Sequence, residues 1–188
     1  TGEYFHEFFD QFIKELNARG LSLRELTSEQ KTAIEEEIFS RMKNNPKFEI
    51  LASSRRLNFI QGLLHQTLMQ TTNALQKQAV ELETKPWMTE VVFGTSGNYP
   101  IHIPIGKDQS IHLRGKIDRI DLLQADKGIY NGIIDYKSSE QRFEIAKLIA
   151  GVQIQLLTYL KVSEEIIRSE TGLVPTPLEA SYIHVHNP

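Results

Sequence analysis

Two consecutive strand-like segments, residues 111–123 and 128–139, constrain the fold of this chain more than any other feature. A turn signal at residues 126–128, Asp-Lys-Gly, lies between them and predicts a β-hairpin. A hairpin brings the faces of its two strands together, so the polar residues on those faces are expected to meet. The first segment carries Asp118 and the second carries Asp135, which predicts two neighbouring carboxylates on one sheet.

Side-chain alternation predicts which residues share a face of this hairpin. Asp135 and Lys137 are two apart, so both are expected on the same face of their strand. On the first segment, Asp118 is expected to share its face with three basic or polar residues, His112, Arg114 and Lys116. Two carboxylates and one ammonium group would then converge on one spot.

Such a convergence suits a hard divalent metal, a water and a scissile phosphate. Mg²⁺ prefers oxygen ligands and usually takes one or two carboxylates, with water and phosphate filling the other positions. The bound metal acidifies a water and neutralises charge on the phosphate oxygens, and Lys137 can orient that water. The alternative is structural, because Asp-x-Lys is common on strands and an Asp118-Arg119 pair is typical of a solvated surface.

Three further features of the sequence are candidates for the site, and each also has a purely structural explanation. Gln155 and Tyr159 are four apart in a largely apolar run, so a helix places them on one face, although a bland helix surface explains them equally well. His6 lies in an aromatic helical segment, where most histidines are packed at the edge of a core. Glu90 lies in the strand-like stretch TEVVFG and can be an ordinary surface acid.

Taken in order, these motifs resemble a known family. The segments GEYFHEFF, GKIDRID, IIDYKSS and QLLTY, followed by LEASYIHVHNP, look like the RecB-type branch of the PD-(D/E)XK nucleases. Within that branch the chain is most similar to the C-terminal nuclease domain of the AddB group, also called RexB. The resemblance covers residues 1–188, and the order and spacing of the motifs make it specific although each motif is short.

The resemblance implies a set of metal ligands for Mg²⁺ or Mn²⁺. His6 would be a ligand supplied by the first helix, and Asp118 and Asp135 would be the metal carboxylates. The backbone carbonyl of Tyr136 would complete the inner shell. The role of Glu90 is left unassigned, because its segment does not align with confidence.

The resemblance also implies the catalytic residues and the reaction. Lys137 would be the catalytic lysine, and Gln155 and Tyr159 would form an accessory pair near the DNA backbone and the active site. The implied activity is exonucleolytic trimming of the 5′-ended strand as a helicase subunit of the AddA or RexA type unwinds double-strand-break ends for recombinational repair. Many members carry four cysteines that hold an iron–sulfur cluster, but this chain has no cysteine and cannot hold one.

Composition fits one globular domain, and the resemblance implies that it is the nuclease part of a larger, cytoplasmic protein. The 188 residues are 40% apolar and 24% charged, and no apolar stretch approaches the ~20 residues that cross a bilayer. The net charge of −3 is unusual for a free-standing DNA-binding module, so DNA contact requires local positive charge. Candidate positions are Arg55-Arg56, Arg114, Lys116, Arg119, Arg142 and Lys147. The alternative is that these are solvated charges balanced by nearby acids.

The predicted fold class is α+β, with a PD-(D/E)XK core in which helices flank a central mixed sheet. Residues 1–85 are expected to be mostly helical, with helices over about 2–19, 27–45 and 53–83. Residues 86–188 are expected to form the sheet and helix core. We expect strands near 88–94, 100–105, 110–124, 128–137 and 178–186, and a helix over 151–169.

Two other functions stay open on the sequence alone. A nuclease-derived scaffold would bind DNA or a helicase partner without cutting, but it has no need of an intact His6, Asp118, Asp135 and Lys137. A stand-alone nuclease of the same superfamily would lack a large helicase-like region. No phosphate-binding glycine loop is present in the chain, so an ATP-driven motor would have to be elsewhere.

Overall fold

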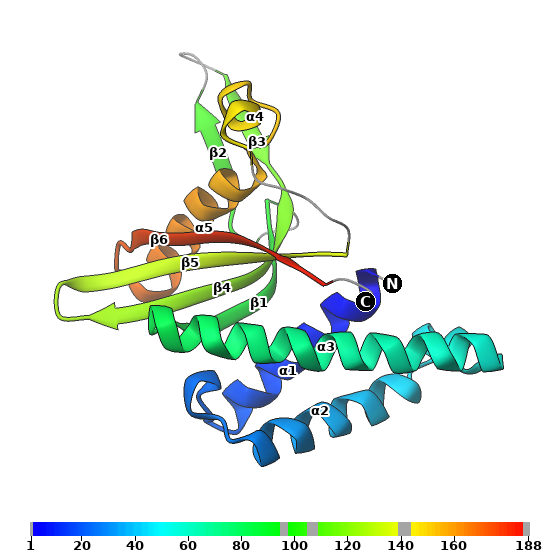
Figure 1. Ribbon diagram of the computed structural model, residues 1–188. Coiled ribbons are helices and arrows are strands. Elements are labelled where there is room, and N and C mark those ends of the chain that lie inside the picture. Colours follow the sequence, from blue (N-terminus) through cyan, green and yellow to red (C-terminus); the bar gives the residue numbers. More distant parts are fainter. Residues whose placement is uncertain (1, 95–97, 105–108, 139–143, 186–188) are drawn as a thin grey trace. The chain divides into compact units, whose positions relative to one another are not determined.

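The computed structural model describes residues 2–94, 98–104, 109–138 and 144–185 (Figure 1). The chain divides into two compact units. The first unit holds residues 1–85, 136–141 and 183–188, and the second holds residues 86–135 and 142–182. As predicted, the architecture is α+β with helices first and a central mixed sheet of four strands. Among the described residues, no helix is both long enough and apolar enough to span a membrane.

The first unit contains three long helices, and the sequence predicts their positions closely. They are α1 (Gly2–Ala18), α2 (Ser28–Lys43) and α3 (Arg55–Leu82). Thr27 and Gln30 form the reciprocal capping box that begins α2. Gly20 follows α1 with a φ of +64°, a conformation that suits glycine at the end of a helix. Two short 3₁₀ helices, η1 (Leu23–Glu25) and η2 (Pro46–Ala52), connect the long ones.

Aromatic packing holds α1 against the rest of the first unit. The buried residues of α1 recur at helical spacing and are Tyr4, Phe5, Phe8, Phe9, Phe12, Ile13 and Leu16. Phe8 stacks on Phe39 of α2, with ring centroids 4.9 Å apart. Burial of such large side chains dominates the stability of a small core.

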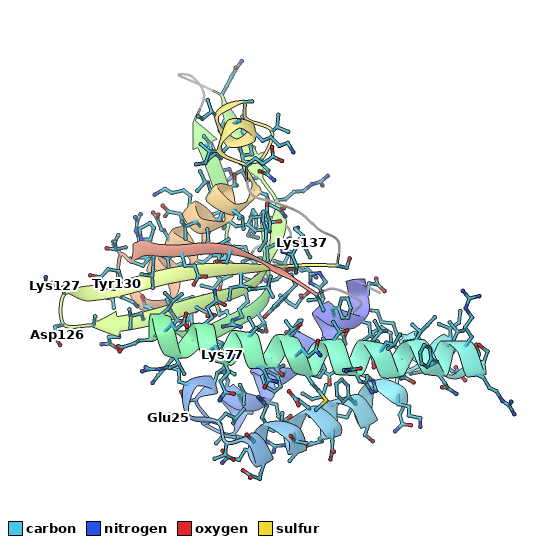
Figure 2. The ribbon with its side chains drawn as sticks, in the orientation of Figure 1. Glu25, Lys77, Asp126, Lys127, Tyr130 and Lys137 are labelled. Carbon is cyan, nitrogen blue, oxygen red and sulfur yellow. The ribbon has the colours of Figure 1, made fainter. Side chains whose placement is uncertain are left out.

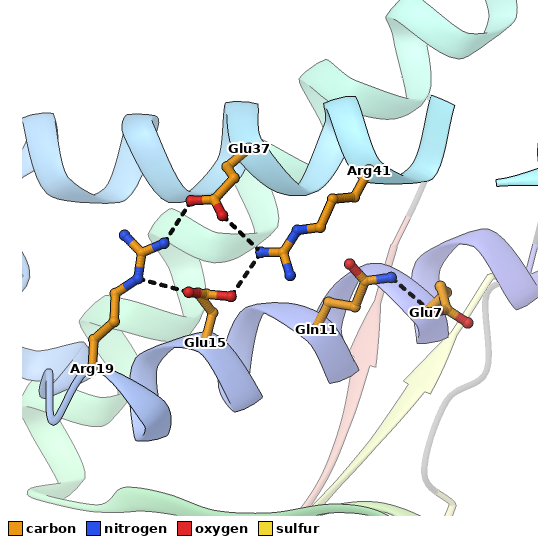
Figure 3. A network of polar contacts seen from close by, with 6 residues as sticks. All are labelled: Glu7, Gln11, Glu15, Arg19, Glu37 and Arg41. Atoms are coloured by element: carbon orange, nitrogen blue, oxygen red, sulfur yellow. Dashed lines mark hydrogen bonds and ion pairs between the residues drawn. The ribbon is translucent and has the colours of Figure 1, made fainter. Parts of the chain in front are cut away.

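Polar networks join the same helices at their edges. On the exposed side, Arg19 and Arg41 each bind Glu15 and Glu37 in a four-residue network between α1 and α2 (Figure 3). The Arg41 and Arg19 guanidinium groups lower the pKa of Glu15. Because this network is exposed to solvent, it orients the two helices more than it stabilises them.

Buried polar contacts fix the register between α2 and α3, which run in opposite directions (Figure 1). Glu35 of α2 accepts a hydrogen bond from Thr72 of α3, and burial raises the pKa of the Glu35 carboxyl. One turn further along α2, Phe39 stacks on His65 of α3 at 3.8 Å between ring centroids. His65 Nε2 also lies 2.6 Å from the hydroxyl of Tyr4, so one histidine of α3 contacts both α1 and α2.

The second unit is built on a four-stranded sheet in the order β1-β4-β5-β6. Its strands are β1 (Lys85–Phe93), β4 (Gly115–Ala125), β5 (Gly128–Lys137) and β6 (Thr176–His184), with some strand ends assigned to the first unit. Helix α5 (Gln155–Thr171) packs on the sheet through its apolar face. The shared core comprises Val91, Phe93, Ile117, Ile120, Ile133, Leu156, Val162, Ile166 and Ile167.

The predicted strand over residues 110–124 is wrong in one respect, because it breaks at Arg114 into two strands of different sheets. β3 (Ser110–Leu113) pairs with β2 (Ile101–Pro104), while β4 joins the main sheet. The backbone at the break approaches its neighbours so closely that glycine is required at positions 94 and 115. A Cβ on Gly94, whose φ is +73°, would lie 1.8 Å from the Leu113 carbonyl oxygen, and one on Gly115 would lie 2.8 Å from the Phe93 ring.

The predicted helix over residues 151–169 is displaced at its start. Gly151 has a φ of +71°, which ends the short helix α4 (Ile145–Ile149) and forces a turn before α5 begins at Gln155. A left-handed residue cannot continue a right-handed helix, so the expected helix begins at Gln155 instead of residue 151, and α4 precedes it as a separate, unpredicted helix.

We predict that His65 makes the stability of the first unit depend on pH. Burial, reinforced by the charge of Lys43, lowers the pKa of His65 from 6.5 to about 4. Since the folded pKa is below the unfolded one, stability is complete above pH 6.5 and falls as the pH drops towards 4. Chemical denaturation at pH 7 and pH 5 should show a loss on the order of 1 kcal/mol that His65→Gln lacks.

The matched control is His112→Gln, because His112 is exposed to solvent in the folded chain. That variant should lose as much stability on acidification as the wild type. An unchanged pH dependence in the His65 variant would contradict the prediction.

Candidate metal-binding and catalytic site

The β4–β5 hairpin sets the two aspartates of the second unit opposite each other. The strands are antiparallel, with Arg119 paired with Ile134 and Ala125 paired with Gly128 around a two-residue loop. One further step along this register brings Asp118 opposite Asp135. Directly opposed residues have Cβ atoms about 4.5–5.5 Å apart on one face. Both residues are buried, with exposed fractions of 6% and 3%.

A third carboxylate, Glu90 of β1, comes close to Asp118. One carboxylate oxygen of Glu90 and one of Asp118 lie within 4.8 Å of each other. Glu90 has a φ of +51°, a left-handed conformation that a non-glycine residue in a strand rarely adopts. Such strain re-aims a side chain and gathers at functional sites. The sequence gives no signal of this backbone conformation, and Glu90 is left unassigned there because its segment does not align with the family motifs.

Helix α5 contributes an amide and a phenol to the same region. Gln155 Nε2 donates to Asp135 Oδ1 at 3.2 Å and also lies 3.2 Å from the Tyr159 hydroxyl. The prediction that Gln155 and Tyr159 share one helix face is therefore confirmed. The Tyr159 ring packs edge-on against Phe93 of β1, with centroids 5.9 Å apart, which ties the helix to the sheet at this point.

The donor set of the second unit fits a hard divalent cation. Glu90, Asp118 and Asp135 supply carboxylate oxygens, which Mg²⁺ and Mn²⁺ accept, and no cysteine competes for a softer metal. Like charges held this close repel one another, and a bound cation relieves that repulsion. The amide of Gln155 holds one oxygen of Asp135 in a fixed direction, which suits a coordinating role for the remaining oxygen.

The basic residues expected around Asp118 divide into different environments. Lys116 binds Glu90, and exposed Lys147 binds Glu144 at 2.5 Å. For these two residues the alternative applies, in which the positive charge is balanced by a nearby acid. Arg119 is neither a DNA-facing cation nor a surface partner of Asp118, because it is 1% exposed and donates to buried Asp121. Alternation along β4 sends Arg119 to the face opposite Asp118. Arg142 lies outside the described residues.

Two other residues predicted to share the face of Asp118 do not belong to its strand. His112 lies on β3, where it pairs with His102 of β2, and exposed Arg114 lies at the break between β3 and β4. The strand break described above removes both from the register of β4. Of the three neighbours predicted for Asp118, only Lys116 stays on its strand.

The first unit carries the remaining predicted residues. The ring of Tyr136 stacks on Phe9 of α1 at 4.2 Å, and the ring of His6 stands edge-on to it at 6.2 Å. Lys137, labelled near the end of β5 in Figure 2, is partly buried, and its carbonyl accepts a hydrogen bond from Val185 at 2.8 Å. His6 thus lies beside the residue that is bonded to both Asp135 and Lys137.

A comparison with protein families decides the class of this arrangement. The model of the PD-(D/E)XK nuclease superfamily matches residues 1–188. The chain belongs to the PD-(D/E)XK nuclease superfamily.

Curated relatives of this superfamily member share one name. The chain is 37% identical over 192 residues to the B subunit of the ATP-dependent helicase/deoxyribonuclease of Enterococcus faecalis. It is 32% identical over 197 residues to the protein of that name from Latilactobacillus sakei, and 33% over 187 residues to that from Listeria monocytogenes. These alignments cover 99–100% of the chain but only 16% of each relative.

We predict that the clustered carboxylates destabilise the metal-free chain and that metal reverses this. In EDTA, Asp118→Asn should leave the melting temperature unchanged or raise it, because one of the repelling charges is removed. In Mn²⁺ the wild type should gain about 2.7 kcal/mol when the metal concentration is about 100 times Kd, and the variant should gain far less. Thermal melts with and without metal measure both effects.

Asp126→Asn is the matched control, since Asp126 lies in the exposed hairpin turn marked in Figure 2. This variant should keep the full gain in Mn²⁺. A marked loss of stability for Asp118→Asn in EDTA would instead assign Asp118 a structural role and contradict the prediction.

Proposed function

We propose that this chain is the nuclease domain of a larger helicase–nuclease and hydrolyses DNA phosphodiester bonds with Mg²⁺ or Mn²⁺. The observation that carries the proposal is the opposed, buried pair Asp118 and Asp135, with Glu90 close to Asp118 and Gln155 bound to Asp135. Family membership supports the reaction class, and the name of the relatives supports the helicase context. Both compact units would act together as one domain.

In this proposal Asp118, Asp135, the carbonyl of Tyr136 and His6 hold the metal, and Glu90 is an additional candidate ligand. The metal would supply Lewis-acid stabilisation of phosphate charge and a more acidic water. The position of His6 beside Tyr136 supports its inclusion, because Tyr136 is bonded to Asp135. The stack of Phe9 on Tyr136 would keep that backbone segment rigid, so that the carbonyl presents a constant direction.

Lys137 would act on the proton of the attacking water. Alternation along β5 places Lys137 on the same face as Asp135, which is the face of the paired carboxylates. An ammonium there can orient the water by hydrogen bonding and stabilise its deprotonated form. Gln155 would hold Asp135 and, with the Tyr159 hydroxyl, offer hydrogen bonds to a phosphate oxygen of the strand.

The biological context belongs to the same proposal. The name of the relatives supports a DNA substrate and a helicase-type partner, here a helicase subunit of the AddA or RexA type. We propose exonucleolytic cutting of the 5′-ended strand at unwound double-strand-break ends, in the cytoplasm, during recombinational repair. The second candidate, a scaffold that binds without cutting, is disfavoured by the buried carboxylate pair, because burying two like charges costs stability that a scaffold gains nothing from.

We predict that two substitutions on one strand separate metal binding from chemistry. Asp135→Ala should remove nearly all cutting of single-stranded DNA, because it removes a metal ligand. Lys137→Ala should keep the Mn²⁺-induced rise in melting temperature but slow cutting by ~10²–10⁴-fold. Single-turnover assays with a labelled strand, combined with melts, give both quantities.

Lys127→Ala is the control for Lys137, because it removes the same type of side chain from the exposed turn of the same hairpin (Figure 2). It should cut at the wild-type rate. Full activity of a folded Asp135→Ala protein would end the nuclease assignment.

We predict that His6→Ala weakens Mn²⁺ binding more than Mg²⁺ binding, because imidazole is a better ligand for the softer ion. Calorimetric titration of each metal into wild type and variant measures the affinities, and circular dichroism checks the fold. His102→Ala, at an exposed position on β2, is the matched control and should bind both metals as the wild type does. Reduced stability of His6→Ala with unchanged metal affinity would show a packing role only.

A further inference from the structure

An exposed patch at the start of α3 combines positive charge with apolar side chains. Arg55 and Arg56 begin the helix, and Phe59 lies one turn further along, on the same face as Arg55. Ile50 of the neighbouring helix η2 is also exposed. Phe59 and Ile50 are 68% and 69% exposed, the highest values for large apolar residues in the described part of the first unit. We call Ile50, Arg55, Arg56 and Phe59 the cationic–aromatic patch.

The two arginines of this patch differ from most others in the chain. Arg19, Arg41 and Arg168 all bind glutamates, whereas no ion pair involves Arg55 or Arg56 within the described residues. The sequence has no acidic residue from position 50 to position 80, a stretch that includes nearly all of α3. In a chain whose net charge is −3, this is a local surface of positive charge.

Helix stability does not account for the patch. The positive end of a helix dipole lies at its N-terminus, where it disfavours cations and favours acids. The first turn of α3 nevertheless carries two arginines and no acid. Phe59 faces water, where it gains nothing from burial. The arrangement therefore costs the free chain stability, and a ligand that is anionic and flat would relieve both costs.

We propose that the cationic–aromatic patch binds a single strand of nucleic acid, outside the metal site, with the arginines on phosphates and Phe59 stacked on a base. Basic groups that follow a backbone, combined with an exposed aromatic ring, are the usual elements of sequence-independent single-strand binding. Duplex bases are already stacked, so the ring selects the unpaired strand. The inference deepens the proposed function and rests on it for the choice of DNA. A protein partner is the competing occupant, but the long absence of acids on α3 fits a uniformly charged polyanion better.

The test is the equilibrium binding of a fluorescently labelled 20-nucleotide thymidine strand to the 188-residue chain in EDTA, where no metal-dependent cutting occurs. Arg55→Gln and Arg56→Gln should each weaken binding several-fold and reduce the dependence of log K on log salt by about 0.7. Phe59→Ala should weaken binding about 10-fold, and Phe59→Trp should keep affinity and show quenched fluorescence on binding.

Two controls lie on the same helix, roughly five turns or more away from the patch. Lys77→Gln removes an exposed cation (Figure 2), and Val80→Ala trims an exposed apolar residue. Both should bind the strand as the wild type does. Thermal melts of every variant show whether it is folded, and because all the substituted side chains are exposed, each is expected to melt near the wild-type temperature.

Three results would overturn the inference. Wild-type affinity and salt dependence in the Arg55, Arg56 and Phe59 variants would exclude nucleic acid from the patch. Normal strand binding, combined with weakened association with the helicase partner, would make it a protein interface. Equal affinity for duplex, insensitive to Phe59→Ala, would exclude stacking.

The inference and the proposed function fail separately. If Asp135→Ala abolishes cutting but the patch variants bind DNA normally, the nuclease assignment stands and the proposed DNA-binding role of the patch is rejected. If Asp135→Ala still cuts but the patch variants bind DNA more weakly, the catalytic assignment is rejected and the DNA-binding role of the patch stands.

Discussion

The register of the β4–β5 hairpin is the constraint on which the candidate site depends. Side chains alternate with a period of two, so a slip of one residue would send Asp118 or Asp135 to the opposite face. The two-residue loop and the pairing of Ala125 with Gly128 fix that register at one end. At the other end, burial of Arg119 with Asp121 on the opposite face makes a slip costly, because it would expose apolar side chains and bury unmatched charge.

Carboxylates held close together repel one another and lower the stability of the folded chain unless a cation is bound between them. Glu90 approaches Asp118 from a left-handed backbone conformation, and Asp135 is held by the amide of Gln155. Without a cation these groups repel one another. A bound cation relieves that repulsion, so the repulsion itself favours cation binding. The site is therefore organised by electrostatic strain and by hydrogen bonds from α5, whereas the apolar core beneath it supplies rigidity.

The division of the chain into two compact units passes through β5, between Asp135 and Tyr136. Residues with proposed roles therefore lie in both units, although they are consecutive in sequence. In the first unit, the aromatic core of α1 places Phe9 and His6 against Tyr136. In the proposed mechanism the helical part therefore matters, because its aromatic packing orients Tyr136, which lies between Asp135 and Lys137.

The sequence by itself determined the elements whose signals are local. Helical periodicity, the capping box at Thr27, the Asp-Lys-Gly turn and the spacing of Gln155 and Tyr159 each depend on neighbours within a few residues, and the structure agrees with them. Other features were decided by tertiary structure alone. The break at Arg114 lies where Gly94 and Gly115 closely approach residues distant in sequence, and buried Arg119 pairs with Asp121 inside the sheet. The approach of Glu90 to Asp118 arises from strand pairing and a left-handed residue, because neither depends on composition or local periodicity.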